Sequence, residues 1–171
     1  MEKPFDGVYP ERSRGTQDRL DIVELKQLDL SLLRELARFE EEAYEVGGFN
    51  EWSLVIFVRN GRLLILKKEG EIVGTAELIK DWDSGKAYLA GFAIKREERG
   101  KSVGSYFLGE ILRRLKNAGF PGVELTVSSK NIAALRLYQK FGFIKTSFVK
   151  DMYGEGEDRL ILELDFRKTP K

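Results

Sequence analysis

The stretch FAIKREERGKSVG at residues 92–104 decides how this sequence folds, because its hydrophobic period changes within it. The apolar residues before Lys95 end a β-rich run that begins at Ala87. From Val103 onward, apolar residues recur at helical spacing. We therefore predict a strand, a turn at residues 99–104, and the start of a helix.

The turn at residues 99–104 has the composition of an anion-binding site. It precedes the first turn of a helix, where unpaired backbone N–H groups and the positive end of the macrodipole meet. Gly100 and Gly104 would let the backbone approach a phosphate closely. Ser102 can cap the helix, and Arg99 and Lys101 add positive charge. A plain helix start with two solvated cations fits the same residues, so the turn alone leaves both interpretations open.

Two common phosphate-binding loops do not fit the spacing of this turn. The tripeptide GKS at residues 100–102 resembles the end of a P-loop, but that motif needs a glycine where Lys95 stands. A dinucleotide-binding GxGxxG would need glycines at Ser102 and Ser105. Neither a P-loop nucleoside triphosphatase nor a dinucleotide-binding domain is therefore indicated.

Turn and periodicity signals divide the rest of the chain into strands and helices. Strands are expected at residues 19–25, 63–67, 71–79, 87–94, 123–127, 143–150 and 160–166. Helices are expected after Asp29 as far as Gly47, after Asn50 through Val58, from Ser102 to Asn117, and at residues 131–140. This order predicts an α/β (α+β) three-layer sandwich with a mixed, mostly antiparallel sheet of six or seven strands and about four helices.

Composition narrows the possible chemistry and partners. The chain has 171 residues, 42% of them hydrophobic, and a formal net charge of +1. These values fit a single domain over residues 1–171, with residues 1–16 as a loose N-terminal arm and no nucleic-acid or membrane partner. Cysteine and histidine are absent from the sequence, which excludes disulfides, thiolate zinc sites, and Ser-His-Asp or Cys-His catalysis. We expect a cytoplasmic protein without a metal ion, either a monomer or a homodimer.

The turn and a second motif together resemble the GNAT superfamily of N-acetyltransferases. The family motif Q/R-x-x-G-x-G/A is similar to residues 99–104, with Ser102 in place of the first glycine. A sequence similar to N-x-x-A-x-x-L-Y-x-x-x-G-F ends the acetyl-CoA site of the family, and this chain matches it at Asn131, Ala134, Leu137, Tyr138, Gly142 and Phe143. The resemblance covers roughly residues 71–166.

The resemblance implies acetyl-CoA as co-substrate and a primary amine of a small molecule, peptide or protein as acceptor. A backbone amide near residues 92–94 would polarise the acetyl carbonyl, amides at residues 100–105 would hold the pyrophosphate, and Asn131 would bond the pantetheine arm. The implied cofactor-binding residues are Phe92, Ala93, Ile94, Arg99, Gly100, Lys101, Ser102, Val103, Gly104, Ser105, Asn131, Ala134 and Tyr138.

The resemblance also assigns catalytic roles, although it leaves the general base open. Tyr138 is the implied general acid, whereas its helical spacing alone fits a core aromatic. The two positions at which family branches carry a catalytic glutamate are Tyr88 and Thr126 here. Glu124 and Glu77 are the candidate bases on neighbouring strand positions. A base acting through water and an amine that arrives neutral are further alternatives.

The role of one acidic cluster and two alternative functions stay open at the level of the sequence. The cluster Glu40-Glu41-Glu42 with Tyr44 at the end of the first helix fits a solvated acidic face, with guidance of a cationic acceptor as the alternative. The missing family carboxylates also fit a non-catalytic acyl-CoA-binding sensor or regulatory module with a GNAT fold. A regulator that binds a nucleotide through the turn at residues 99–104 is a second alternative to an acetyltransferase.

Overall fold

The computed structural model describes residues 19–44 and 47–168, which fall into two compact units. The N-terminal unit contains the described residues up to Lys80 together with residues 89–107. The C-terminal unit contains residues 81–88 and 108–168. Strand β4 and helix α3 each contribute residues to both units, and each unit is described by itself. The predicted loose arm at residues 1–16 lies outside the described residues.

The described chain forms seven strands and four α-helices, as the periodicity predicts. The strands are β1 (Leu20–Glu24), β2 (Arg62–Lys68), β3 (Glu71–Lys80), β4 (Ala87–Ile94), β5 (Gly122–Val127), β6 (Ile144–Val149) and β7 (Arg159–Asp165). The α-helices are α1 (Leu30–Ala43), α2 (Glu51–Asn60), α3 (Val103–Asn117) and α4 (Ile132–Lys140), and a short 3-10 helix covers Arg96–Glu98.

The strands pair in the order β1-β2-β3-β4-β5-β7-β6. The pairs β1–β2, β2–β3, β5–β7 and β6–β7 are antiparallel. Between β4 and β5 the chain passes through α3, which is the kind of crossover connection that parallel neighbours require. The mixed, mostly antiparallel sheet with four helices confirms the predicted fold class.

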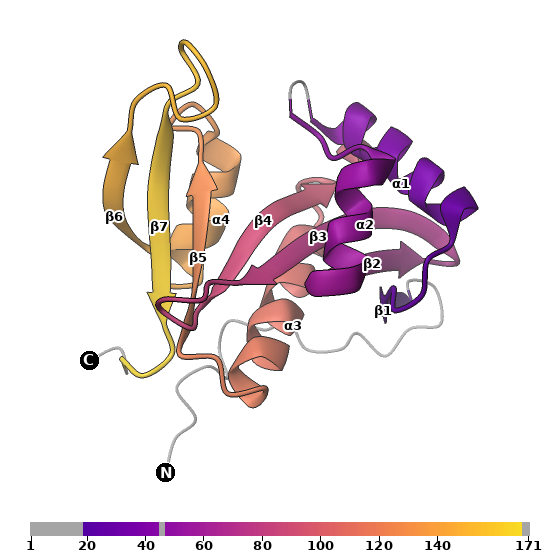
Figure 1. Cartoon of the computed structure of the whole chain (residues 1–171), viewed down its shortest axis with the longest axis horizontal. Helices are drawn as coiled ribbons and strands as arrows, with labels where there is room; N and C mark the ends of the chain where they lie inside the picture. Colours follow the sequence, from indigo (N-terminus) through magenta and orange to yellow (C-terminus); the bar gives the residue numbers. More distant parts are fainter. Residues whose placement is uncertain (1–18, 45–46, 169–171) are drawn as a thin grey trace. The chain divides into compact units, whose positions relative to one another are not determined.

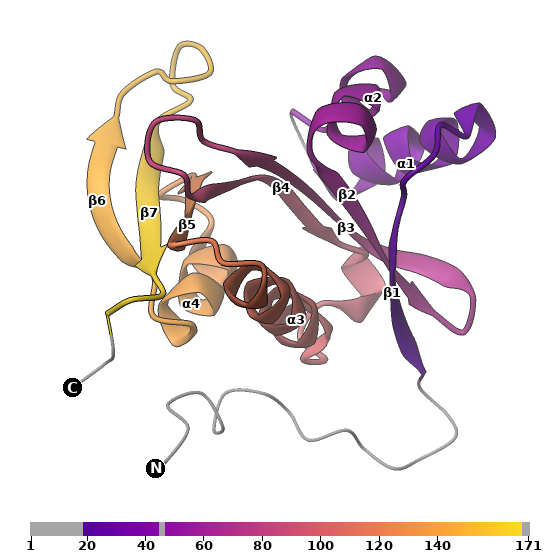
Figure 2. The same ribbon diagram turned by 60° about the horizontal axis from the view of Figure 1, so that its bottom comes forward.

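In the N-terminal unit, α1 and α2 cover one face of β2 and β3 (Figures 1 and 2). Both helices begin at capping residues: Asp29 accepts from the N–H of Leu32 and Asn50 accepts from that of Ser53. Their apolar side chains pack onto this face. The buried cluster comprises Leu33, Leu36, Leu54, Phe57, Leu63 and Ile65.

The buried stripe of α1 differs from a purely apolar one. It consists of Leu33, Leu36 and Glu40, whereas Phe39 is only partly buried. Glu40 is fully buried, so the expectation of a solvated acidic face is wrong for this residue and right for the exposed Glu41 and Glu42. The spacing of residues 33, 36 and 40 follows the helical period, which places Glu40 under the helix.

In the C-terminal unit, α4 lies on one face of β5 and β7 (Figure 2). The β6–β7 hairpin shifts its register between Lys145 and Ser147. Side chains from α3, β5, α4 and β7 form the core of this unit, which includes Ile111, Leu112, Leu115, Val123, Leu125, Val127, Tyr138, Phe141, Phe143, Leu162 and Leu164. Tyr138 therefore belongs to a core, as its helical spacing indicates.

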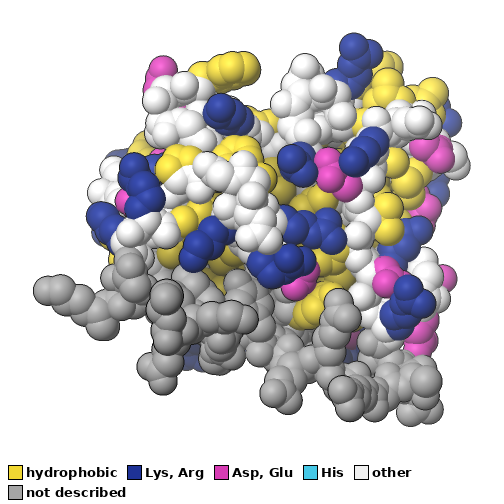
Figure 3. Space-filling view, turned by 90° about the horizontal axis from the view of Figure 1, so that it is seen from below, with side chains coloured by type: hydrophobic (Ala, Val, Ile, Leu, Met, Phe, Trp, Pro, Cys, Tyr) yellow, Lys and Arg dark blue, Asp and Glu magenta, His cyan; other side chains and the backbone are white. Residues whose placement is uncertain are grey.

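The surface carries charges of both signs. On the face shown in Figure 3, Lys and Arg side chains stand among hydrophobic, acidic and uncharged ones. This mixture agrees with the net charge of +1. None of the helices in residues 19–44 and 47–168 combines the length and the apolar character needed to cross a bilayer.

Candidate active site

The backbone of the turn after β4 explains why glycine suits the motif position that Ser102 occupies. Gly100 has φ +76° and Ser102 has φ +64°, both in the left-handed region that favours glycine. The hydrogen-bond ladder of α3 starts from the Tyr106 N–H to the Ser102 carbonyl, at 3.0 Å. The amides of residues 103–105 thus lie ahead of this ladder, at the positive end of the helix. Phe92 stacks on Phe107 at a centroid distance of 5.5 Å, which ties β4 to the first turns of α3.

Arg99 holds the turn through backbone carbonyls. Its Nε donates to the carbonyl of Ile94 and its Nη2 to that of Ala43, both at 2.9 Å. The guanidinium therefore joins the end of β4, the turn and the C-terminus of α1. Lys101 lies 3.5 Å from Glu98, which also pairs with Lys68 at 3.2 Å.

The amide of Phe92 already has an acceptor from α1. The N–H of Phe92 donates to the hydroxyl of Tyr44 at 2.8 Å. Tyr44 is the residue at which α1 ends, and its own N–H donates to the carbonyl of Glu40 at 2.9 Å. A ligand carbonyl that used the Phe92 amide would have to replace the Tyr44 hydroxyl.

A buried acidic cluster lies between α1 and β3 in the same unit. The side chains of Glu40, Thr75 and Glu77 are all fully buried. The Thr75 hydroxyl donates to Oε1 of Glu40, and the Phe49 N–H donates to Oε2 of Glu40 at 3.5 Å. Neither carboxylate oxygen of Glu77 has a partner of normal hydrogen-bond geometry among the described residues.

Burial dominates the protonation of this cluster. It raises the pKa of Glu40, against the lowering effect of the bonds from Thr75 and Phe49. It raises the pKa of Glu77 well above the ordinary value, and the nearby Glu40 raises it further, while Thr75 lies near enough to lower it in part. The two carboxyl groups are therefore linked in their titration.

Gly91 makes room for the Glu77 carboxylate beside β4. A Cβ on Gly91 would lie 2.3 Å from Oε2 of Glu77 and 2.8 Å from Cε2 of Phe49. A side chain at this position would displace the Glu77 carboxylate or the Phe49 ring, so glycine permits their close approach to β4. Because Gly91 precedes Phe92, the carboxylate lies next to the amide that bonds Tyr44.

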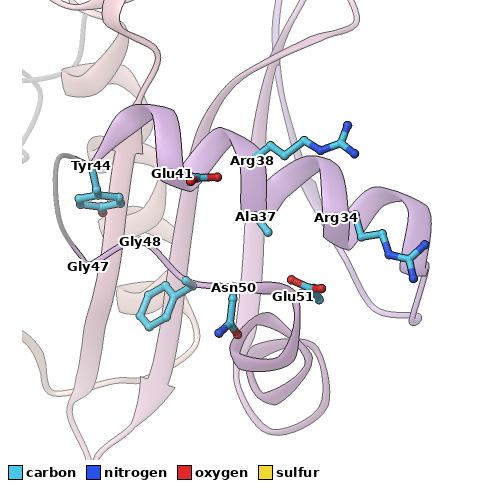
Figure 4. Close-up of a pocket in the computed structure, with 10 residues that line it drawn as sticks. Arg34, Ala37, Arg38, Glu41, Tyr44, Gly47, Gly48, Asn50 and Glu51 are labelled. Atoms are coloured by element: carbon cyan, nitrogen blue, oxygen red, sulfur yellow. The ribbon is translucent and has the colours of Figure 1, made fainter.

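A groove of about 590 Å³ opens beside this cluster, between the end of α1, residues 47–50 and the start of α2 (Figure 4). Its lining consists of Arg34, Ala37, Arg38, Glu41, Tyr44, Gly47, Gly48, Phe49, Asn50 and Glu51. Phe49 lines the groove and also reaches the vicinity of Gly91 and Glu77. No residue pattern in the sequence indicates this groove directly.

The second sequence motif lies in the C-terminal unit. Asn131 caps α4, where its side-chain oxygen accepts from the N–H of Ala134 at 3.1 Å. The Tyr138 side chain is 7% exposed and lies 5.5 Å from the ring of Phe143. Burial raises the pKa of the Tyr138 hydroxyl, so the phenol is in its proton-donating form at neutral pH.

Tyr88 and Thr126, at the two positions where family branches carry a catalytic glutamate, have hydroxyl groups in place of a carboxylate. The Tyr88 hydroxyl lies 3.4 Å from that of Thr126, and the Tyr153 hydroxyl lies 3.3 Å from each of them. Burial raises the pKa of Tyr88 to about 12. This group therefore keeps its proton at neutral pH and does not provide a base there.

Glu124 lies on β5 with a partly exposed side chain. Partial burial and the neighbouring Glu163 raise its pKa, while Lys86 lowers it. Lys86 also forms a hydrogen-bonded ion pair with Glu163. This setting is that of a surface carboxylate within a charge network.

The predicted site residues are thus divided between the units. The N-terminal unit holds residues 92–105 and Glu77, whereas the C-terminal unit holds Glu124, Asn131, Ala134 and Tyr138. From the sequence, Glu40 was assigned only to an acidic cluster at the end of the first helix, and the roles of Thr75 and Gly91 and the Tyr44–Phe92 bond were missed. The apolar spacing of Leu33 and Leu36 could have indicated that Glu40 is buried. In the described part of the chain, no group of three or more acidic, cysteine or histidine side chains could hold a metal ion.

The acetyltransferase (GNAT) family matches this chain over residues 22–143. Among curated proteins, the spermine/spermidine N(1)-acetyltransferase of Bacillus subtilis (strain 168) is 31% identical over 103 residues. That alignment covers 56% of this chain and 66% of the relative, so the chain spans slightly less than two thirds of the relative's length.

Solved structures share the fold. Ard1 from Thermoplasma volcanium superposes with a TM-score of 0.75 at 19% identity, covering 85% of this chain and 97% of Ard1. A GNAT family acetyltransferase from Elizabethkingia anophelis, solved with acetyl-CoA bound, has a TM-score of 0.65 at 18% identity, covering 89% of this chain and all (100%) of that one. The family match over most of the sequence, together with this shared fold, shows that the chain belongs to the GNAT family of acetyltransferases.

Proposed function

We propose that this protein transfers the acetyl group of acetyl-CoA to a primary amine of a small molecule, peptide or protein. The observation that carries the proposal is the left-handed turn at Gly100 and Ser102, which leads from β4 into the positive end of α3. An added Cβ on Gly100 would meet no atom within 4 Å, so the turn is open on that side. A pyrophosphate fits such a place.

The assignment of donor-binding residues follows from this turn and from the family motifs. The Phe92 amide would bond the acetyl carbonyl in place of the Tyr44 hydroxyl, with the backbone of Ala93 and Ile94 alongside pantetheine. The amides of residues 100–105 would hold the pyrophosphate, with Lys101 adding charge nearby. Arg99 supports the turn through its two carbonyl contacts. Asn131 and Ala134 would complete the site for the pantetheine arm.

Tyr138 would protonate the departing thiolate. The phenol holds its proton at neutral pH, which is the form that a general acid needs. The acetyl-CoA seen in the related structure from Elizabethkingia anophelis supports the same donor here. The amine acceptor is supported by the name of the Bacillus subtilis relative, which acts on spermine and spermidine.

The test is release of free CoA from acetyl-CoA over a panel of small amines, polyamines, amino acids and peptides. Turnover with at least one amine supports an N-acetyltransferase. Tight acetyl-CoA binding without turnover on any acceptor would instead support a non-catalytic sensor, which the hydroxyls at Tyr88 and Thr126 favour. Thermal shift with ATP and with CoA separates both from a nucleotide-binding regulator, since only a CoA site should need pantetheine for tight binding.

A further inference from the structure

We propose that Glu40 and Glu77 act as a pair that accepts the proton of an acceptor amine arriving as an alkylammonium ion. The inference rests on the proposed acetyl transfer and supplies the base which that reaction needs. It places this base on α1 and β3, at positions different from Tyr88 and Thr126.

Two carboxyl groups are buried at one place in the N-terminal unit. Glu40 and Glu77 are each 0% exposed, and Glu77 makes no hydrogen bond of normal geometry within the described residues. A buried carboxylate without a partner is unfavourable unless it has a function or is protonated. Its position beside a predicted acyl site therefore suits a group that takes up and releases a proton.

Glu77 lies close to the predicted position of the acyl group. Its Oε2 lies against Gly91, and the next residue, Phe92, has the amide that would bond the acetyl carbonyl. A nitrogen that attacks this carbonyl must lie near the same part of β4. The Cα atoms of Gly91 and Phe92 are about 3.8 Å apart, and in the proposed reaction the proton moves from the nitrogen to Glu77 directly or through one water molecule.

The groove and the acid pair share one residue, Phe49. Phe49 lines the groove, and its ring lies beside Gly91 and the Glu77 carboxylate. The N–H of the same residue donates to Glu40. Phe49 thus lies between the groove and the acid pair, and the proposal requires an amine in the groove to reach the pair past its ring. Glu41 and Glu51 also line the groove and favour a cation there, while Arg34 and Arg38 oppose it.

A pair of carboxyl groups suits this role better than one. Two buried carboxylates in electrostatic contact share one proton, because both cannot ionise at low cost. With one proton the pair carries one negative charge, which attracts the ammonium, and burial keeps the pKa of Glu77 above that of an exposed glutamate. Glu40 is the titratable group that acts on Glu77, and Thr75 donates to Glu40 from β3.

The reaction balances as follows. The ammonium loses one proton to the Glu40–Glu77 pair. The nitrogen lone pair then forms a bond to the acetyl carbon while the carbonyl π electrons move to oxygen. The electrons on oxygen then re-form the carbonyl as the C–S bond breaks, the bonding pair stays on sulfur, and Tyr138 protonates the thiolate. The nitrogen loses its second proton, which restores Tyr138 through solvent. The products are the N-acetyl amine, CoA and one proton, which leaves the pair for solvent.

The experiment compares Glu77→Gln with the wild-type protein on two acceptors of similar size. One is the best alkylamine of the panel, which is protonated at pH 7, and the other is a weakly basic analogue that is mostly neutral, such as a trifluoroethyl-substituted amine. For the alkylamine we expect kcat/KM to fall at least 100-fold, within the usual range for general bases. For the weakly basic amine we expect a change below about 5-fold. Glu42→Gln, on the exposed side of α1, is the matched control.

Thr75→Val provides a second readout that a purely structural role would not move. The Thr75 hydroxyl, which donates to Glu40, lowers the pKa of both glutamates, so its removal should shift the acidic limb of the kcat/KM profile to higher pH. Retained acetyl-CoA binding shows that each variant is folded. Equal losses on both acceptors, or an unshifted profile, would overturn the pair as base. Absence of CoA release from the wild-type protein itself would instead contradict the proposed function, and the inference with it.

Discussion

At the scale of single residues, Ser102 shows why a family position is normally glycine. Its φ of +64° lies in the left-handed region, where a Cβ costs about 1–2 kcal/mol. The turn nevertheless forms, because Phe92 packs on Phe107 and Arg99 holds the carbonyl of Ile94. Serine retains the backbone amide that the proposed pyrophosphate contact needs.

Ser102→Gly should stabilise the protein by up to about 1 kcal/mol, because glycine adopts this φ without strain but loses more entropy on folding. Urea denaturation measures the change. Gly100→Ala, at φ +76° with open space around it, is the opposite control and should destabilise by a similar amount. We expect CoA affinity to stay within a few fold for Ser102→Gly. Far tighter binding would show that the serine impairs the loop.

Tyr138→Phe tests the proposed general acid. Phenylalanine keeps the packing against Phe143 and removes only the hydroxyl. We expect acetyl-CoA affinity within a few fold of the wild-type value and turnover at least tenfold lower, in the range for acid catalysis. Binding by calorimetry and CoA release by a thiol reagent measure the two quantities. Unchanged turnover would show that Tyr138 is a core aromatic alone.

At the scale of elements, the end of α1 is tied to β4 twice. Arg99 donates to Ala43 in the last turn of the helix, and Tyr44 accepts from Phe92. The C-terminus of α1 therefore connects the groove with the predicted acetyl-CoA site at β4. This arrangement makes the Tyr44 hydroxyl a competitor for the acetyl carbonyl.

Tyr44→Phe should increase the affinity for acetyl-CoA by about 2- to 10-fold, because a net hydrogen bond of roughly 0.5–1.5 kcal/mol no longer has to be exchanged. The affinity for CoA without the acetyl group should not change, since CoA has no carbonyl at this position. Calorimetric titration with both ligands measures the difference. Tyr88→Phe, in the separate hydroxyl cluster, is the control. An equal effect on both ligands would mean that the Phe92 amide does not bind the acetyl group.

At the scale of the whole molecule, two kinds of carboxyl group give opposite pH dependences. The exposed Asp81 and Asp165 have pKa values lowered by hydrogen bonds from Ser84 and Arg167 respectively. Their stabilising contributions are present above about pH 4 and are lost as the pH falls through the lowered values. Burial raises the pKa of Glu40 and Glu77. Their favourable contribution is present below about pH 4.5 and is lost as the pH rises through the raised values.

The wild-type melting temperature should therefore be highest in mildly acidic solution and decline toward pH 8. Glu77→Gln cannot ionise, so its melting temperature should decline less and exceed that of the wild-type protein at pH 8 by about 3 °C or more. Differential scanning calorimetry from pH 4 to pH 9 measures both curves. Glu42→Gln should follow the wild-type curve. Parallel curves for Glu77→Gln and the wild-type protein would contradict a raised pKa at Glu77.

Most of the fold could be predicted because its signals are local. The Asp29 and Asn50 caps, the period change at Val103 and the Glu69-Gly70 turn are each decided by a few neighbouring residues. The burial of Glu40 on α1 was not predicted, because a glutamate is expected from sequence to lie on the solvated face of a helix. Only packing against β3 buries Glu40 next to Thr75.

The sequence by itself determined the family, the strand-turn-helix at residues 92–104 and the motif from Asn131 to Phe143, because these depend on spacing along the chain. The tertiary structure decided which groups meet. It brought Tyr44 to the Phe92 amide, Tyr88 to Thr126 and Tyr153, and Glu40 to Glu77. The physical reason is that hydrogen bonds and carboxyl pKa values depend on distances and burial, which segments 35 or more residues apart acquire only when the chain folds.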